Sequence, residues 1–167
     1  GHTKVVTDSG EGLAKVGFPS LAGNYEERLA MEGLRLSTLE MVEIANQKLL
    51  VGQSALKHST RIFNAREKGW IGSVAYMALM KNAIRYSTPS SISVVITSGL
   101  PVSHYKTDRG KLANLIREIA KAEAITVNVK VIPQPLGTFF NLLLDEHGEV
   151  RDEELVTSRI GVLDIGF

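Results

Sequence analysis

Three short segments of this 167-residue chain carry side chains whose type and position could serve chemistry: GHTKVV (1–6), VIPQPLG (131–137) and GVLDIGF (161–167). Lys4 supplies an ammonium group, Gln134 a neutral amide and Asp164 a carboxylate. Glycines stand in all three segments, and a glycine lets the backbone approach a ligand closely. Groups of these kinds hold phosphate oxygens and hydrated divalent cations.

Each segment also has a plain structural interpretation. A strand lysine such as Lys4 is commonly just solvated, and an N-terminal Gly-His is also typical of a tag remnant. Gln134 stands where a strand passes into a helix, at the edge where open α/β sheets bind ligands. Taken alone, that segment favours a polar cap residue. Asp164 ends an apolar strand, where a carboxylate needs a cation or donors, although an N-cap or turn aspartate is the alternative.

The elements that must position these residues follow from the hydrophobic pattern. Strands are expected at 3–7 and 13–18, the second stopping at Pro19, and a hairpin with an Asn-Gln turn is expected from Leu39. Residues 24–37 are ambiguous and stay unassigned. Helical spacing predicts a helix within 69–87.

The second half alternates strands and helices. The pattern predicts a strand at 92–101 that is buried on both faces, followed by a helix at 106–123 and a strand at 124–132. A helix is expected from 133 to 146, with Pro135 in its first turn. A polar turn region at 147–154 and a last strand at 159–167 complete the pattern. Strand–helix–strand order implies a largely parallel sheet with flanking helices. The fold class is therefore α/β, with a strand-rich N-terminal half.

Composition and missing motifs exclude several classes of function. The net charge of +1 gives no support for direct binding to nucleic acid. No apolar run reaches the roughly 20 residues that span a bilayer, and the chain has no cysteine, so thiol chemistry is excluded. The four histidines have no metal-ligand spacing. The chain also lacks a complete P-loop, G-x-S-x-G and G-x-G-x-x-G.

The runs SVVITSGLPVSHYKTDRGKL, VNVKVIPQPLGTFFNLLLD and GVLDIGF, with FPSLAG after the first hairpin, resemble the N-terminal lobe of actin-like ATPases. The resemblance is greatest to plasmid-segregation proteins of the ParM/StbA type and their archaeal relatives. It covers most of the chain, is strongest at 92–167 and weakest at 24–60. It implies a ribonuclease H-like, actin-type first lobe with a mixed sheet and flanking helices. This lobe would form a single domain over 1–167, incomplete at both ends, with a variable subdomain at 24–60.

The resemblance assigns roles residue by residue. GHTK matches the second half of a first phosphate loop, so Gly1, His2 and Thr3 would give backbone contacts and Lys4 would contact phosphate. Gln134 matches the residue that orients the attacking water. In the second phosphate loop, Asp164 would hold Mg²⁺ through water and Gly166 would approach the γ-phosphate. The implied cofactors are ATP or GTP and Mg²⁺.

The resemblance also implies a cytoplasmic parent protein that self-associates into filaments, with a possible adaptor protein and no membrane partner. The first strand before GHTK, the remainder of the second phosphate loop and the second lobe are absent from this chain. The chain alone is therefore expected to be inactive. Two alternatives remain open: a non-catalytic actin-fold scaffold, and a small-molecule kinase with the same core.

Overall fold

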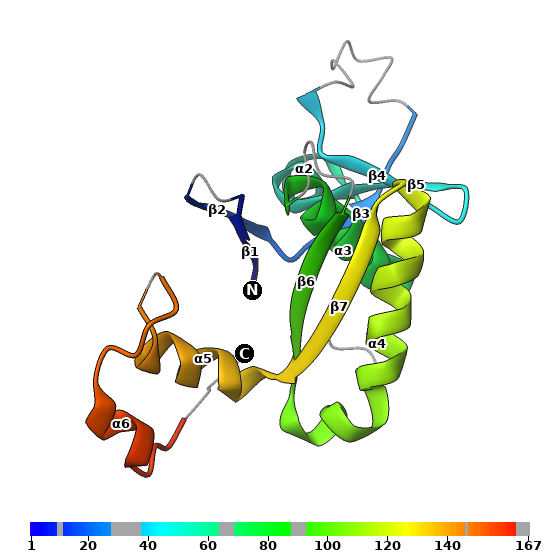
Figure 1. The fold of residues 1–167 in the computed structure, drawn as a ribbon. Coiled ribbons are helices and arrows are strands. Elements are labelled where there is room, and N and C mark those ends of the chain that lie inside the picture. The colour runs from blue at the N-terminus through cyan, green and yellow to red at the C-terminus, as the bar shows by residue number, and fades with distance from the viewer. Residues whose placement is uncertain (10–11, 28–37, 64–68, 88–92, 146, 163–167) are drawn as a thin grey trace. The chain divides into compact units, whose positions relative to one another are not determined.

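The computed structural model describes residues 1–9, 12–27, 38–63, 69–87, 93–145 and 147–162. The chain divides into two compact units, Gly1–Val94 with Leu115–Val127, and Val95–Asn114 with Asn128–Phe167. Strands and helices are interspersed along it, as Figure 1 shows. The expected α/β class is therefore confirmed at the level of a mixed α/β fold.

The first unit begins with a β-hairpin. Strand β1 (His2–Asp8) pairs antiparallel with β2 (Leu13–Pro19). Alternate residues of β1 are half-buried, among them Thr3 and Val5, while the residues between them are exposed. Val5 packs against the hydrophobic core. Both expected strands are thus confirmed, including the stop at Pro19.

A second, three-stranded sheet has the order β3-β5-β4, from β3 (Ala22–Asn24), β4 (Met41–Ile44) and β5 (Gln47–Val51). The hairpin predicted from Leu39 is confirmed, but its turn is Ala45–Asn46 rather than Asn-Gln. Ala45 and Asn46 have φ of 50° and 62°, as in the mirror-image turns that suit the twist of paired strands. Gln47 already pairs with Ile44.

Helices α2 (Gly52–His58) and α3 (Val74–Ser87) both contact this sheet. Leu49 and Val51 belong to the same core cluster as Ala78 of α3, whereas Leu50 clusters with Ala55 of α2. Successive strand residues point to opposite faces, so β5 is buried on both sides. The helix predicted within 69–87 is confirmed and begins at Val74.

The next three elements are β6 (Ser93–Leu100), α4 (Val102–Ala122) and β7 (Thr126–Pro133). Strands β6 and β7 form a two-stranded sheet and run in the same direction in Figure 1. Leu112 and Ile116 of α4 are fully buried. The prediction that β6 is buried on both faces is wrong, because its residues alternate and Val95 is 62% exposed.

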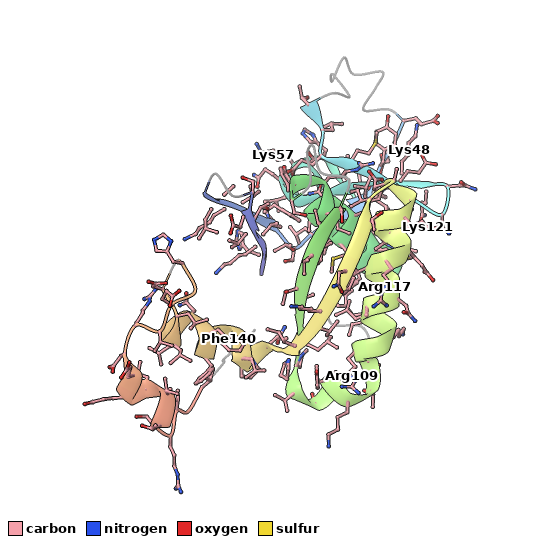
Figure 2. The ribbon with its side chains drawn as sticks, viewed as in Figure 1. Lys48, Lys57, Arg109, Arg117, Lys121 and Phe140 are labelled. Carbon is pink, nitrogen blue, oxygen red and sulfur yellow. The ribbon has the colours of Figure 1, made fainter. Side chains whose placement is uncertain are left out.

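The second unit continues with α5 (Gln134–Leu143), which follows β7 directly, and α6 (Glu153–Thr157). Much of the apolar surface of α5 faces outward, including Phe140, labelled in Figure 2 and 42% exposed. The side chain of Asp152 caps α6 by accepting a hydrogen bond from the backbone N–H of Glu154. The prediction of a strand from 159 is wrong over 159–162, which have no regular structure, and residues 163–167 lie outside the described part.

The sequence pattern predicts a largely parallel sheet in the second half attached to a strand-rich first half, and the resemblance implies a mixed sheet with flanking helices. The described strands form three separate sheets, of which only β6–β7 is parallel. Elements β3, α2 and α6 were not predicted at all; each is short, from three to seven residues. Among the described helices, none combines the length and apolar character needed to cross a membrane.

Candidate functional site

The strongest candidate site lies where β6 and β7 end. Both strands are followed directly by helices, α4 after Leu100 and Pro101, and α5 after Pro133. Because the two strands run parallel (Figure 1), their carboxyl ends lie at the same edge of the sheet. That edge is where open α/β sheets bind their ligands.

Gln134 is the first residue of α5 at this edge. Pro133 is the N-cap, with φ −60° and ψ 133°, and Pro135 occupies the first turn. Proline fixes its own φ near −65°, so the backbone is restricted on both sides of Gln134. The Gln134 side chain is exposed, and its amide makes no hydrogen bond to any residue in the described part of the chain. A polar cap role is not supported, because the helix start has no side-chain cap hydrogen bond.

A glycine that the sequence analysis did not assign to the site lies against Gln134. A Cβ built on Gly99, the penultimate residue of β6, would lie 3.0 Å from Cγ of Gln134. The signal available in the sequence was the position of Gly99 at the end of an apolar strand, which by itself predicts only a turn.

The Lys4 side chain lies on the outward face of the β1–β2 hairpin. It is exposed and directly opposite Gly17 in the antiparallel register. Opposed residues of an antiparallel pair share a face, so Gly17 leaves the surface beside Lys4 open. Lys15 is on this face too, because it pairs with Val6.

Thr3 points the other way. Its hydroxyl lies 2.9 Å from the Ser20 hydroxyl, and the carbonyl of Gly1 accepts a hydrogen bond from the Ser20 backbone N–H at 3.0 Å. His2 is exposed and pairs with Pro19. Contacts with Ser20 therefore join the start of β1 to the residue that follows β2. They lie at the residues that the resemblance assigns to a phosphate loop.

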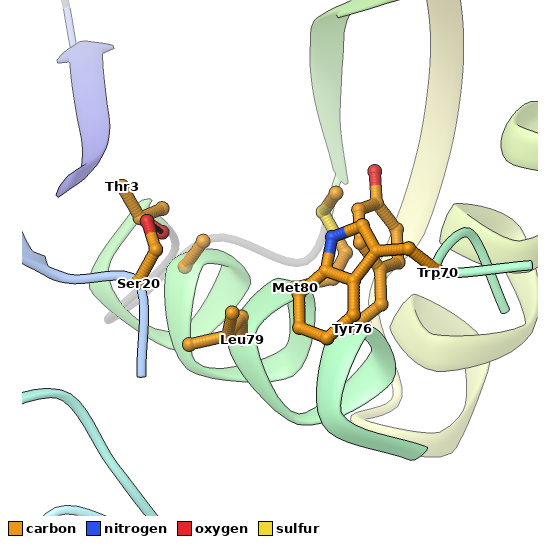
Figure 3. A pocket seen from close by; sticks show the side chains of 7 residues that line it. Thr3, Ser20, Trp70, Tyr76, Leu79 and Met80 are labelled. Carbon is orange, nitrogen blue, oxygen red and sulfur yellow. Dashed lines mark hydrogen bonds between the residues drawn. The ribbon is translucent and has the colours of Figure 1, made fainter. Parts of the chain in front are cut away.

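Thr3 and Ser20 line a pocket of about 330 Å³ in the first unit, shown in Figure 3. Its other lining residues are Trp70, Tyr76, Leu79, Met80 and Ala83. The rings of Trp70 and Tyr76 lie edge to face, with their centroids 5.9 Å apart. Burial raises the pKa of Tyr76, which keeps the phenol neutral. None of the described residues that line this pocket is charged, so none of them supplies the cation that phosphate binding requires.

Two of the expected site residues, Asp164 and Gly166, lie outside the described residues. Lys4 and Gln134 belong to different compact units, and each is described within its own unit. The described residues contain no group of three His, Asp or Glu side chains able to hold a metal ion. Hydrated Mg²⁺ needs only one or two protein carboxylates, so it does not require such a group of three.

A His–Asp pair was also missed by the sequence analysis. His104 Nδ1 and Asp108 Oδ2 lie 3.2 Å apart in α4, and the His104 side chain is 60% exposed. Residues four apart on a helix are surface neighbours, which accounts for this contact without a catalytic role.

Comparison with known proteins identifies the family. Residues 1–137 match the family model described as the N-terminal domain of actin-like proteins. The chain therefore belongs to the actin-like proteins and contains their N-terminal domain. Searches of curated proteins and of solved structures each found no match.

Proposed function

We propose that this chain is the first lobe of an actin-like ATPase that forms filaments in a nucleotide-dependent way. The particular type is that of the ParM/StbA plasmid-segregation proteins, with a ribonuclease H-like core and a cytoplasmic cytoskeletal role. Membership in the actin-like family gives the coarse class. The observation that carries the proposal further is the exposed amide of Gln134, which has no hydrogen-bond partner among the described residues and lies at the carboxyl edge of two parallel strands.

The proposed chemistry is hydrolysis of the γ-phosphate of ATP or GTP. Phosphoryl transfer to water depends on positioning and charge neutralisation more than on covalent chemistry. An uncharged amide suits the positioning task, because it can accept a hydrogen bond from the attacking water and donate another. Gln134 therefore orients the water without itself taking the proton.

The remaining proposed contacts belong to the two phosphate loops. Lys4 neutralises phosphate charge, and the backbone of Gly1, His2 and Thr3 lies along the phosphates. Asp164 holds the hydrated Mg²⁺, and Gly166 leaves room for the γ-phosphate. When bound, Mg²⁺ supplies charge neutralisation at the phosphate oxygens.

Filament contacts are the second part of the proposal. Residues 24–60 form a variable subdomain that supplies contacts between copies of the parent protein, and an adaptor protein links the filament to its cargo. Neither nucleic acid nor a membrane is a direct partner.

The proposal is tested on the full-length protein that carries this chain. Gln134→Ala should lower kcat for hydrolysis by about 10²-fold, the order of effect expected for one positioned group in proton-coupled chemistry. Nucleotide affinity should stay unchanged, because Gln134 acts on the water and not on the nucleotide. Phosphate release and binding of a fluorescent ATP analogue measure the two quantities.

Asn141→Ala is the matched control, since it removes another exposed amide from the same helix. It should leave both quantities unchanged. An equal loss of binding and hydrolysis in Gln134→Ala would make Gln134 a structural residue. A wild-type protein that neither hydrolyses nucleotide nor sediments as polymer with Mg²⁺ and ATP would contradict the proposed function and favour a non-catalytic scaffold.

A further inference from the structure

The end of β6 and the start of α5 approach each other at Gly99 and Gln134. A Cβ added to Gly99 would lie 3.0 Å from Cγ, 3.5 Å from Cα and 3.8 Å from Cβ of Gln134. Both residues belong to the same compact unit. A separation of 3.0 Å between carbon atoms is well inside the optimal 3.5–4.0 Å, so any side chain larger than hydrogen at position 99 displaces its neighbour.

The backbone conformation does not explain this glycine. Gly99 lies within a regular strand and is not among the described glycines with positive φ. An L-residue can therefore adopt its backbone geometry without strain. Glycine instead leaves space at this position, and Cγ of Gln134 lies beside that space.

The backbone of Gln134 cannot easily retreat from a larger neighbour, because Pro133 and Pro135 restrict it on both sides. The side chain can move instead, since it is exposed and has no hydrogen bond among the described residues. A methyl group at position 99 would thus push the Gln134 side chain aside by a few tenths of an ångström while leaving the fold intact.

We infer that Gly99 is a positioning residue that sets where the Gln134 side chain lies and so where its amide points. This inference rests on the proposed hydrolytic role of Gln134. It extends that role to β6, because the end of this strand is the surface against which the Gln134 side chain lies.

The test is Gly99→Ala in the full-length protein. We expect kcat for nucleotide hydrolysis to fall by up to about 10-fold, since a 1 Å misplacement of a positioned group costs about 100-fold and the methyl group requires a shift of a few tenths of an ångström. Nucleotide affinity and the melting temperature should stay at wild-type values, because the displaced side chain is exposed.

Gly137→Ala is the matched control. Gly137 lies on α5 three residues after Gln134, and a Cβ there would meet nothing within 4 Å. This variant adds the same methyl group to the same helix, and we expect it to hydrolyse nucleotide at the wild-type rate.

A double-mutant cycle separates positioning from a general structural effect. In a Gln134→Ala background no Cγ remains for the new methyl group to displace, so Gly99→Ala should cause no further loss of kcat. A further loss of the same size in that background would overturn the inference. So would a wild-type kcat in the Gly99→Ala single variant.

The side-chain amide resonance of Gln134, assigned by its loss in Gln134→Ala, gives a readout that does not depend on turnover. It should shift in Gly99→Ala and stay in place in Gly137→Ala. If the wild-type protein hydrolyses nucleotide but Gly99→Ala leaves both kcat and this resonance unchanged, only the positioning role fails. If the wild-type protein hydrolyses no nucleotide, the proposed function fails and the positioning role fails with it.

Discussion

At the scale of single residues, two side chains with suitable chemistry are placed where a ligand can reach them. Gln134 is exposed and without a hydrogen-bond partner in the described structure, and Lys4 is exposed on the open face beside Gly17. Thr3 is different, because its hydroxyl is engaged by Ser20. Any phosphate contact from Thr3 is therefore expected from its backbone rather than its hydroxyl.

Lys4→Ala in the full-length protein should weaken nucleotide binding. A hydrogen bond to a charged group contributes about 1.5–3 kcal/mol, so the dissociation constant should rise by about 10- to 150-fold. Isothermal titration calorimetry with a non-hydrolysable ATP analogue measures this change.

Lys15→Ala is the control for charge, since Lys15 is an exposed lysine on the same face of the hairpin. It should change the affinity much less than Lys4→Ala does. Equal effects of the two substitutions would indicate a diffuse electrostatic contribution and would contradict a direct contact between Lys4 and phosphate.

At the scale of elements, one carboxylate connects three parts of the first unit. Glu40 Oε2 accepts a hydrogen bond from the backbone N–H of Gln53 at the start of α2, and its Oε1 accepts one from the Tyr86 hydroxyl of α3. The N-cap residue of α2 makes no side-chain cap hydrogen bond, so Glu40 supplies the missing acceptor. A Cβ on Gly52, which has φ of 59°, would lie 2.6 Å from the Glu40 carboxylate.

Glu40→Ala should therefore lower the free energy of unfolding by about 1–3 kcal/mol, because it removes a helix cap and leaves polar groups without partners. Urea denaturation of the full-length protein, followed by circular dichroism, measures the loss. Glu43→Ala, at an exposed position of β4, should stay within about 0.5 kcal/mol of wild type. Similar losses in the two variants would show that Glu40 does not cap α2.

A second group of charges connects α3 with the residue that follows α4. Glu123 pairs with Lys81 at 2.8 Å and with Arg85 at 3.1 Å. The same two basic side chains donate hydrogen bonds to the backbone carbonyls of Glu43 and Met41 in β4. Burial pushes the pKa of Glu123 up, but the hydrogen bonds and charges of Arg85 and Lys81 outweigh it and lower the pKa below its usual 4.5.

This shift makes a prediction about pH. A carboxylate whose pKa is lower in the folded state stabilises the fold fully above its unfolded pKa, and this contribution is lost as the pH falls through the folded pKa. Glu123→Gln should therefore destabilise the protein by about 1 kcal/mol at pH 7 and by less as the pH falls below 4.5. Urea denaturation across this range checks it. Glu118→Gln, at an exposed position of α4, is the control. If the stability of Glu123→Gln depended on pH as the wild type does, the lowered pKa of Glu123 in the folded state would be contradicted.

At the scale of the whole molecule, each compact unit carries residues to which a role toward nucleotide is proposed. Lys4 belongs to the first unit, whereas Gly99 and Gln134 belong to the second. A ligand that binds the folded chain and not the unfolded one stabilises the folded state by mass action, in proportion to the logarithm of its concentration.

Mg²⁺ with a non-hydrolysable ATP analogue should thus raise the melting temperature of the full-length protein. At a ligand concentration 100 times the dissociation constant, the added stability is about 2.7 kcal/mol. Chelation of Mg²⁺ with EDTA should remove most of the shift, since the metal neutralises the phosphate charge. A melting temperature that ignores the analogue at saturating concentration would contradict the nucleotide site.

The sequence by itself determined the elements with strong local patterns. Leu112 and Ile116 lie on the buried stripe of α4 because helical spacing puts them on one face, and β1 and β2 form a hairpin that stops at Pro19 as expected. The sequence also placed Gln134 where a strand passes into a helix, which the structure confirms, while the role of its amide stays a prediction. Short elements such as β3 and α2 carry too few residues for a periodic signal.

Only the tertiary structure decided which residues meet. The turn at Ala45–Asn46 depends on the pairing of Ile44 with Gln47, and the exposure of Val95 depends on which face of β6 is covered. The contact between Gly99 and Gln134 joins positions 35 residues apart in sequence, through the parallel arrangement of two strands. Such a contact leaves no local pattern, because it arises from strand pairing rather than from the preferences of neighbouring residues.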